Sequence, residues 1–291
     1  MTSLQTLLPD VPPVGSSPSR MDGLTYGHRS RLQAACDDLV QGLRQWRIWW
    51  VLAFLEIRQR YRRSLVGQFW VTLSMAATIA GIGIVFGAIF NQPLSDYLPF
   101  LGVGIIVWGL LSGLTNDLAS AFISSENYLK NYPGPRSIVI YRTIARNLIS
   151  SAHNVALIPI LLVLFGVPLT WWLLLTVPAI ALIACNAVWI GMLIGPLSAR
   201  FRDLPQLVVN ITQLAFFVTP IMFRPGQVQD RLWAVTHLNP FASFVEILRA
   251  PILGSSPGAY HWVFAGAVTV LGFAVAIPFY ARFRGRIVYW L

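Results

Sequence analysis

Four arginines stand close together at the end of a tryptophan-rich segment: Arg58, Arg60, Arg62 and Arg63. A guanidinium group binds phosphate oxygens through two parallel hydrogen bonds, whereas a lysine offers only a point charge. The cluster could therefore hold a phosphate or pyrophosphate headgroup at a membrane surface. It could equally do no more than orient the chain and attract anionic lipid, which is worth about 1 kcal/mol for each basic residue of either type.

An acidic residue, Asp117, falls within an otherwise apolar run. An unpaired carboxylate at the centre of a bilayer costs about 2.5–3.5 kcal/mol on insertion scales. We therefore expect Asp117 to face water in a hydrated vestibule or to form a structural ion pair, which we favour slightly, with Arg146 or Arg142 of the next apolar segment. Three other polar residues in apolar runs are expected to form hydrogen bonds between helices: His153, Asn154 and Asn186.

Catalytic signatures are missing from the sequence. It contains no phosphate-binding loop of the form GxxxxGK[ST], no GxSxG motif and no paired carboxylates in one loop. A membrane glycosyltransferase acting on a lipid carrier would need carboxylates in a cytoplasmic loop, and the longest one expected, 123–144, offers only Glu126. A proton-driven transporter should show several intramembrane carboxylates, and we find only Asp117. Any energy for work must therefore come from a partner.

Metal and disulfide chemistry are not expected either. The chain has four His and two Cys, and their positions show no metal-ligand spacing. Cys36 lies in a polar region and Cys185 in an apolar run, so the two thiols should sit at different depths and not form a disulfide. We expect no metal and no cofactor bound by this chain.

The elements that position these residues are long apolar segments. Of the 291 residues, 56% are hydrophobic and 11% are charged, against about 25% charged in soluble domains. The mean hydropathy of +0.63 and apolar runs of helix-spanning length predict an all-α integral membrane protein. The net charge of +10 does not indicate nucleic acid, because the basic residues lie at the ends of apolar runs.

Six segments reach the roughly 20 residues that a helix needs to cross the hydrocarbon core. If the N-terminus is cytoplasmic, nearly all of the 21 Lys and Arg lie on the inside, and only Arg224, Arg231 and Arg249 lie outside. The positive-inside rule therefore predicts that both termini are cytoplasmic. The expected spans are 66–90, 98–122, 145–167, 171–198, 205–223 and 260–281.

The corner between the fourth and fifth spans carries Arg200, Arg202 and Asp203. We interpret it as a tight cytoplasmic turn, in which the arginines anchor the topology and Asp203 caps the following helix.

Segments outside the spans complete the predicted organisation. Residues 1–42 are expected to form a disordered cytoplasmic tail, and residues 43–63 an amphipathic helix in the membrane interface, because tryptophans share one face with arginines beside it. Residues 64–291 form the six-span domain. Within it, the outer segment 224–258 should contain short helices in or on the outer leaflet, one of them starting at Asn239-Pro240.

Four stretches occur in order along the chain: "LEIRQRYRRSLVGQFWVTL", "ENYLKNYPGPRSIVIYRTIARNLI", "ARFRDLPQLVVNITQLAFFVTPIMF" and "LNPFASFVEILRAPIL". Taken singly each motif is weak, but the ordered set is specific and covers residues 43–291. The set resembles the permeases of ABC-2 type polysaccharide exporters.

The resemblance implies a homodimeric pore in the bacterial inner membrane, paired with two copies of a cytoplasmic ABC ATPase that binds the ATP and Mg. It implies export of a lipid-linked polysaccharide, such as O-antigen, teichoic acid, capsule or cell-wall galactan; export of a different amphiphile is the alternative. The arginine cluster would then meet the phosphate of the lipid-linked cargo among the membrane lipids.

The resemblance also implies roles for particular residues. A coupling helix near Pro133–Ile144 would dock into the ATPase, with the charged corner on the same face. Because sugars stack on aromatic rings, aromatic residues would line the export path, although many aromatics instead form the interfacial belt. The coupling residues are Pro133, Arg136, Tyr141, Arg200, Arg202 and Asp203, and the path residues are Trp70, Trp108, Phe216 and Phe217.

Overall fold

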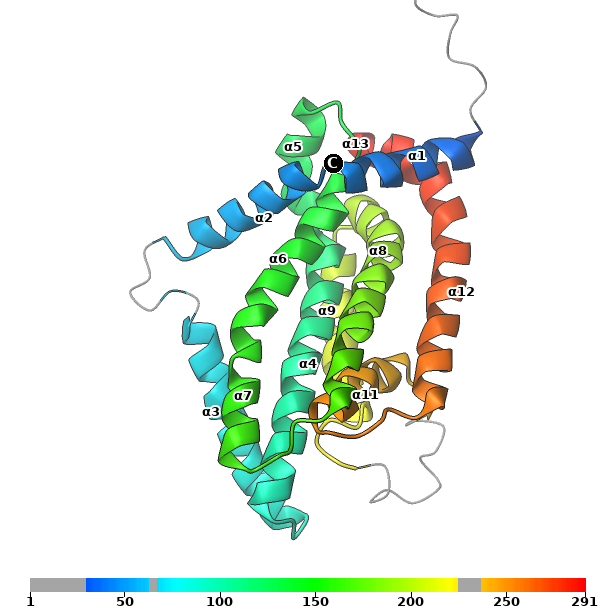
Figure 1. Cartoon of the computed structure of the whole chain (residues 1–291). Coiled ribbons are helices and arrows are strands. Elements are labelled where there is room, and N and C mark those ends of the chain that lie inside the picture. The colour runs from blue at the N-terminus through cyan, green and yellow to red at the C-terminus, as the bar shows by residue number, and fades with distance from the viewer. Residues whose placement is uncertain (1–29, 63–66, 68, 225–236) are drawn as a thin grey trace, which may run out of the picture.

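Helices make up all the regular structure of the described residues of the computed structural model, which are 30–62, 67, 69–224 and 237–291 (Figure 1). In chain order they are α1 (Arg31–Arg44), α2 (Trp46–Arg60), α3 (Phe69–Ile89), α4 (Leu94–Ser120), η1 (Ile123–Ser125), α5 (Glu126–Asn131), α6 (Ile138–Val155), α7 (Leu157–Leu164), η2 (Trp171–Leu175), α8 (Thr176–Arg200), α9 (Leu204–Val218), α11 (Pro240–Ile252), α12 (Ala259–Phe283), η5 (Arg284–Arg286) and α13 (Ile287–Trp290).

Within those ranges, five helical stretches are long and apolar enough to cross a membrane, so the chain is a multi-pass α-helical membrane protein. They correspond to the first, second, third, fourth and sixth expected spans. Several begin or end a few residues away from the predicted limits. The five stretches are Phe69–Ile89, Leu94–Ser120, Ile138–Leu164, Trp171–Arg200 and Ala259–Trp290.

The fifth expected span, 205–223, corresponds to α9, which has only 15 residues. At 1.5 Å per residue it is roughly 22 Å long, shorter than the hydrocarbon core. It ends early because Pro220 pushes Thr219 into an extended conformation. A count of six spans therefore stays a prediction. The predicted cap is wrong: Asp203 stands at the N-cap position, but its side chain makes no capping hydrogen bond.

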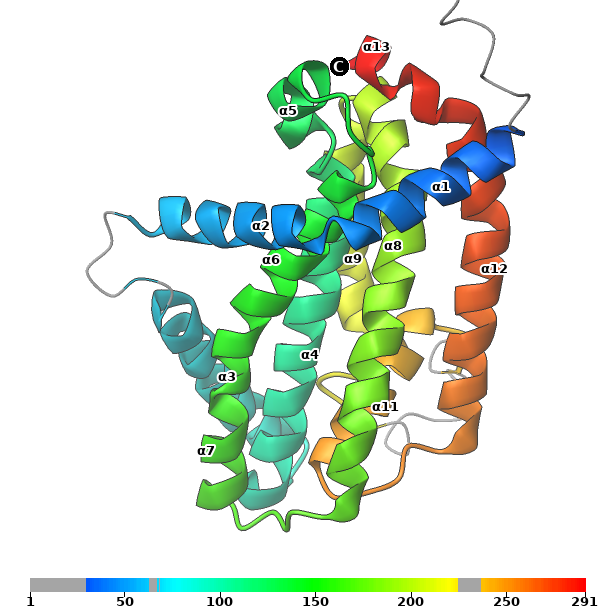
Figure 2. The same cartoon turned by 45° about the horizontal axis from the view of Figure 1, so that its top comes forward.

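The N-terminal region is more ordered than predicted. Helix α1 begins at Arg31, inside the segment expected as a disordered tail, and the rest of that tail, 1–29, lies outside the described residues. A capping box explains the start: the Ser30 hydroxyl accepts from the Gln33 amide at 3.2 Å, and the Gln33 side chain accepts from the Ser30 amide at 3.0 Å. The expected helix 43–63 corresponds to α2. Figures 1 and 2 show α1 and α2 crossing one end of the bundle.

Helix α4 is the centre of the bundle. In its apolar 18-residue stretch 78% of the residues are buried, against 22% or less in the corresponding stretches of the other candidate spans. It packs against α3, α6, α8, α9 and α11. At one end of the bundle lie α1, α5 and α13, and at the other lies α11 (Figures 1 and 2). The expected helix start at Asn239-Pro240 is confirmed, because the Asn239 side chain accepts from the Phe241 amide at 3.0 Å.

Candidate functional site

An ion network joins α2, α4 and α6 at the end of the bundle that α1 and α2 cross. Glu56 on α2 accepts from Arg142 at 3.0 Å and from Arg146 at 2.7 Å. Arg146 also donates to Asp117 on α4 at 2.8 Å, and Asn147 donates to the same oxygen at 2.9 Å. The predicted ion pair between the second and third apolar segments is therefore confirmed, with Arg146 as the partner of Asp117.

The network is electrically balanced, because two arginines face two carboxylates. The Arg142 and Arg146 side chains are only 8% and 16% exposed, and Arg142 makes a further hydrogen bond to the Ser125 hydroxyl at 2.6 Å. Charges this far from water are stable only when they are paired. The network consequently fixes α2 against α4 and α6 and does not present a free charge to a ligand.

The arginine cluster at the end of α2 has a different character. Arg58, Arg60 and Arg62 are exposed, and no ion pair involving them occurs within the described residues. Arg63 lies outside those residues. Arg58 and Arg60 follow Glu56 on α2, and Arg62 lies just past the end of that helix, so the ion network holds the element that carries them. The geometry thus gives a fixed helix with exposed guanidinium groups at its far end.

A second polar junction, centred on Asp38 of α1, ties three distant parts of the chain together. The Asp38 carboxylate accepts from the Arg136 and Ser137 amides at 3.0 and 3.1 Å. It also accepts from the Tyr280 hydroxyl at 3.0 Å and pairs with Arg284 at 3.2 Å. Asp38 is only 6% exposed. Helix α1 is thereby fixed to the start of α6 and the end of α12.

This junction changes the expectation for the coupling region. Arg136 also donates through its side chain to the Arg284 carbonyl, and the Tyr141 hydroxyl donates to the Leu39 carbonyl at 3.2 Å. No separate helix forms over Pro133–Ile144, because α6 begins at Ile138 and its first turns are buried. Pro133 is exposed, so the accessible surface of this loop lies around Pro133 and the adjoining α5.

Helix α5 presents its own polar surface beside that loop. Lys130 forms an ion pair with Glu126 at 2.6 Å, and this lowers the pKa of the Glu126 carboxyl. Tyr132 stacks on Tyr128 with ring centroids 5.1 Å apart. Burial raises the pKa of the Tyr128 hydroxyl to about 12.

The charged corner after α8 lies at the same end of the bundle as these elements. Arg202 donates to the Leu291 carbonyl at 3.2 Å. The Arg200 guanidinium lies over the ring of Trp290, 5.4 Å from its centroid. Both arginines and Asp203 are exposed. The corner, the loop at Pro133 and α5 thus form one polar end of the molecule.

The opposite end is organised by a buried arginine, Arg249 on α11, which is 2% exposed. It forms an ion pair with Glu246 at 2.5 Å and donates to the Pro220 carbonyl at 2.7 Å. Its guanidinium lies over the Phe100 ring at 4.0 Å from the centroid. Arg249 therefore links α11 to α4 and to the chain that leaves α9. Burial lowers its pKa, although Glu246 opposes this effect.

The aromatic residues predicted along a path divide into two groups. Trp108 is 8% exposed and packs between Phe216 and Phe241, with ring centroids 5.7 and 5.3 Å away. It belongs to the core, where it joins α4, α9 and α11. Trp70 and Phe217 are 63% and 70% exposed. Both side chains are accessible. Phe216 is half-buried, so its exposure is intermediate between those of the two groups.

One face of α9 is unusual for an apolar helix because it carries three exposed amides: Gln206, Asn210 and Gln213. Their spacing of four and three residues places them on one face, with Phe217 further along the same stripe. Gln206 donates to Asn210 at 3.2 Å. The other side of α9 is attached to α4, because the Thr212 hydroxyl donates to Asn116 at 2.9 Å.

The remaining intramembrane polar residues largely meet their predictions. Asn154 accepts from Thr72 of α3 at 3.1 Å, and Asn186 donates to Thr269 of α12 at 2.7 Å, so both form the expected hydrogen bonds between helices. His153 differs: its ring hydrogen-bonds with the Ile149 carbonyl of its own helix at 3.0 Å.

Sequence reasoning missed three of the most connected charged residues, Asp38, Glu56 and Arg249. Asp38 was assigned to a disordered tail, although the Ser30-x-x-Gln33 pattern that precedes it is a helix-start signal. Glu56 was given no role within the expected interfacial helix 43–63. Arg249 was counted among the outer arginines, and only its Glu246 neighbour three residues earlier on a helical pattern could have indicated a pair.

Comparison with known proteins assigns the chain to a family and finds relatives with names. A family model described as ABC-2 type transporter matches residues 47–253. A protein from Myxococcus xanthus, called O-antigen export system permease protein RfbA, is 26% identical over 198 residues, which cover 67% of this chain and 76% of the relative. Two Klebsiella pneumoniae proteins of the same name are 26% identical over 206 residues and 24% identical over 242 residues. The second alignment covers 80% of this chain and 90% of the relative.

Proposed function

We propose that this chain, which belongs to the ABC-2 type transporter family, is the membrane subunit of an ATP-driven exporter that carries lipid-linked polysaccharide from the cytoplasmic to the outer side of the bacterial inner membrane. The family match confirms the resemblance identified in the sequence. The chain is a transmembrane transporter subunit. The O-antigen export named in its relatives supports a polysaccharide cargo.

The structural observation that carries the proposal is the amide face of α9. Gln206, Asn210 and Gln213 are exposed on a helix that is otherwise apolar. Polar side chains in a membrane face the bundle interior or a water-filled cavity, because contact with lipid is costly. This face therefore borders water in the assembled exporter. Amides both donate and accept hydrogen bonds, as sugar hydroxyls do, and exposed Phe217 adds an aromatic ring for stacking.

A water-lined path needs walls on both sides, and a single chain leaves the α9 face open. We propose that a second copy of the chain closes it, which makes the pore a homodimer. Two cytoplasmic ATPase subunits would supply the energy and bind ATP and Mg, since the sequence contains no phosphate-binding loop. They would dock on the polar end formed by Pro133, α5 and the corner at Arg200 and Arg202.

In the same proposed assembly, helix α2 lies at the membrane surface. Helix α2 exposes Trp46, Trp50 and Phe54 along one side, a pattern that suits the headgroup layer of the inner leaflet. In this position Arg60 and Arg62 would meet the phosphate of the cargo lipid. The short α9, continued by the extended chain around Pro220, would complete a sixth crossing, and both termini would be cytoplasmic.

Cysteine accessibility tests whether the amide face of α9 borders water. In the assembled exporter, Asn210→Cys and Gln213→Cys should react with a charged, membrane-impermeant thiol reagent applied from a side with access to the path. Leu207→Cys and Ile211→Cys are equally exposed on α9 but lie on the side of the helix away from Gln213, and they serve as controls that should not react. Equal protection of all four positions would contradict a water-lined α9 face and, with it, the proposed path.

The arginine cluster has a test of its own. Arg60→Lys keeps the charge and the topology but loses the paired hydrogen bonds to phosphate. We expect Arg60→Lys to insert and to bind the ATPase normally but to lower polymer export, and Arg60→Gln to lower it further. Export at the wild-type rate from both Arg60→Lys and Arg62→Lys would leave these residues with a topological role only.

A further inference from the structure

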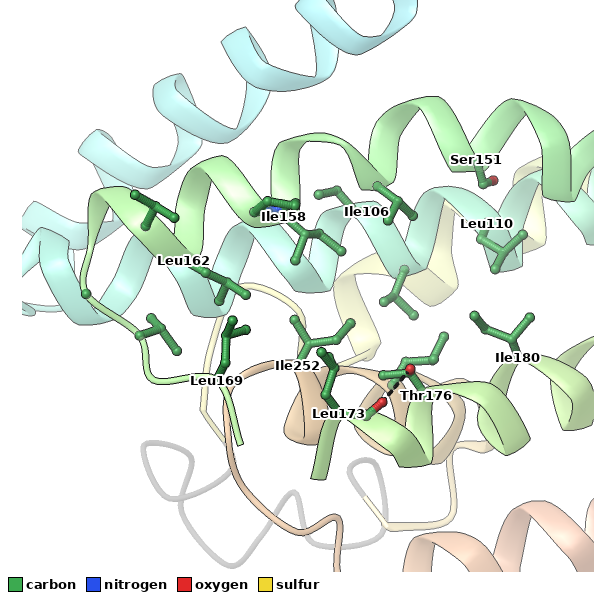
Figure 3. A pocket seen from close by; sticks show the side chains of 17 residues that line it. Ile106, Leu110, Ser151, Ile158, Leu162, Leu169, Leu173, Thr176, Ile180 and Ile252 are labelled. Carbon is green, nitrogen blue, oxygen red and sulfur yellow. Dashed lines mark hydrogen bonds between the residues drawn. The ribbon is translucent and has the colours of Figure 1, made fainter. Parts of the chain in front are cut away.

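A cavity of about 700 Å³ lies between α4, α7, α8 and α11 (Figure 3). It begins beside Ser151 of α6 and extends to Leu169, in the connection that follows α7. Ile106 and Leu110 of α4 form one wall, and Ile252 of α11 closes the inner side. Its helices are candidate membrane spans, and α11 lies at one end of them, so the cavity is at the depth of the bilayer's hydrocarbon in the leaflet on the α11 side.

An empty or a water-filled cavity is physically unfavourable here. The cavity is open at its rim, where Val163 and Leu169 are exposed, and leaving its apolar walls uncovered would forfeit their dispersion contacts. Water needs several hydrogen-bonding partners, and among the described residues that line the cavity only Ser151 and Thr176 carry a hydroxyl. Thr176 already donates to the Leu173 carbonyl at 2.6 Å. An apolar occupant is therefore required.

The surroundings identify the source of that occupant. Val163 and Leu169, which line the cavity, are 84% and 73% exposed. On a membrane-spanning surface such residues touch the acyl chains of the bilayer. Deeper in the cavity, Ile158 and Ile252 are each 8% exposed. The cavity thus runs from the lipid-facing surface to the buried side of α11, and the nearest apolar molecules are bilayer lipids.

We propose that this cavity binds one acyl tail of a phospholipid from the surrounding bilayer. The bound acyl tail supports α11 against α4, α7 and α8. The lipid chain touches Ile252 and Leu248, which flank Arg249 on α11. The site requires only that the protein spans a membrane, so it does not depend on what the exporter carries.

Photo-crosslinking tests the site in the full-length chain reconstituted in nanodiscs. The probe is a phosphatidylcholine with a diazirine on one acyl chain, and adducts are located by peptide mass spectrometry. We expect adducts at Leu248 or Ile252 on α11 as well as at Val163 on the rim. Val270 and Leu271 of α12, which are 69% and 66% exposed, report ordinary contact with lipid.

A cavity-filling variant makes the result specific. Leu162 of α7 also lines the cavity, so Leu162→Trp should abolish the adduct on α11 and leave the α12 adducts unchanged. Ser151→Leu is a second, milder filling variant for the case that Leu162→Trp fails to fold, as judged by size-exclusion chromatography. Absence of α11 adducts in the wild-type chain would overturn the proposal, and so would α11 adducts that persist in a folded filling variant. Reaction of Ser151→Cys with a charged thiol reagent would also overturn it, because it would show a water-filled cavity.

Discussion

Replacing Arg249 with methionine should destabilise the chain strongly, because it strands a carboxylate and a carbonyl at once. The guanidinium is 2% exposed and is the partner of both Glu246 and the Pro220 carbonyl. Removing one member of a buried ion pair costs about 3–5 kcal/mol. Glu246 is 29% exposed, so water compensates in part, and we expect about 3 kcal/mol, near the lower limit.

A second substitution separates the cost of the stranded Glu246 charge from the cost of losing the other contacts of Arg249. In Arg249→Met/Glu246→Leu no charge is stranded, and the main remaining loss is the unpaired Pro220 carbonyl, at about 1–3 kcal/mol. The double variant should therefore be more stable than the single one. Arg249→Lys keeps the charge but cannot serve Glu246 and Pro220 in the same geometry, so it should fall between Arg249→Met and the wild-type chain.

The measurement is thermal unfolding of the purified chain followed by tryptophan fluorescence. One kcal/mol shifts the melting temperature of domains of about 150–250 residues by about 2–4 °C, and on that scale Arg249→Met should melt roughly 6–12 °C below the wild-type chain. The double variant should recover part of that loss. If the single and double variants melt together, the ion pair does not hold α11 and our reasoning about the buried charge is refuted.

Three other predictions follow from the opposite end of the molecule and from the topology. A double-mutant cycle of Asp117→Asn and Arg146→Gln should give a coupling free energy of about 1 kcal/mol, between the values for exposed and buried pairs; zero coupling would mean that water screens the pair. Asp38→Ala should leave the spans intact but raise the rate of tryptic cleavage within α1; a cleavage rate equal to that of the wild-type chain would contradict this. Cysteines at Arg202 and Ser256 should label from the cytoplasmic and the outer side respectively, and labelling of both from one side would rule out the proposed topology.

The parts of the fold that depend on composition alone were predictable from the sequence. An apolar run of sufficient length must be a helix in a membrane, because every backbone polar group has to be satisfied within the segment. Five of the predicted spans therefore coincide with candidate membrane helices. The length of α9 was not predictable in the same way, because hydropathy continues past Val218 while the backbone leaves the helix before Pro220.

The candidate site was harder to predict because its contacts join distant positions. The partner of Asp117 could be named, since Arg146 lies on the next apolar segment. The partners of Arg136 and Tyr141 could not be named in this way, because they lie in distant segments: they are Asp38, Leu39 and Arg284. A charged residue that orients the chain and one that closes a buried junction look alike in a single sequence, and only the packed structure separates them.

The Asp38 junction also has a consequence for how the molecule is made. Asp38 binds residues 98 and 242 positions later in the chain, Arg136 and Tyr280. At about 5–20 residues per second of synthesis, roughly 12–50 seconds separate the appearance of α1 at the ribosome from that of its last partner. Helix α1 can therefore meet the start of α6 long before α12 exists, and the Asp38 junction is complete only after synthesis has passed Arg284.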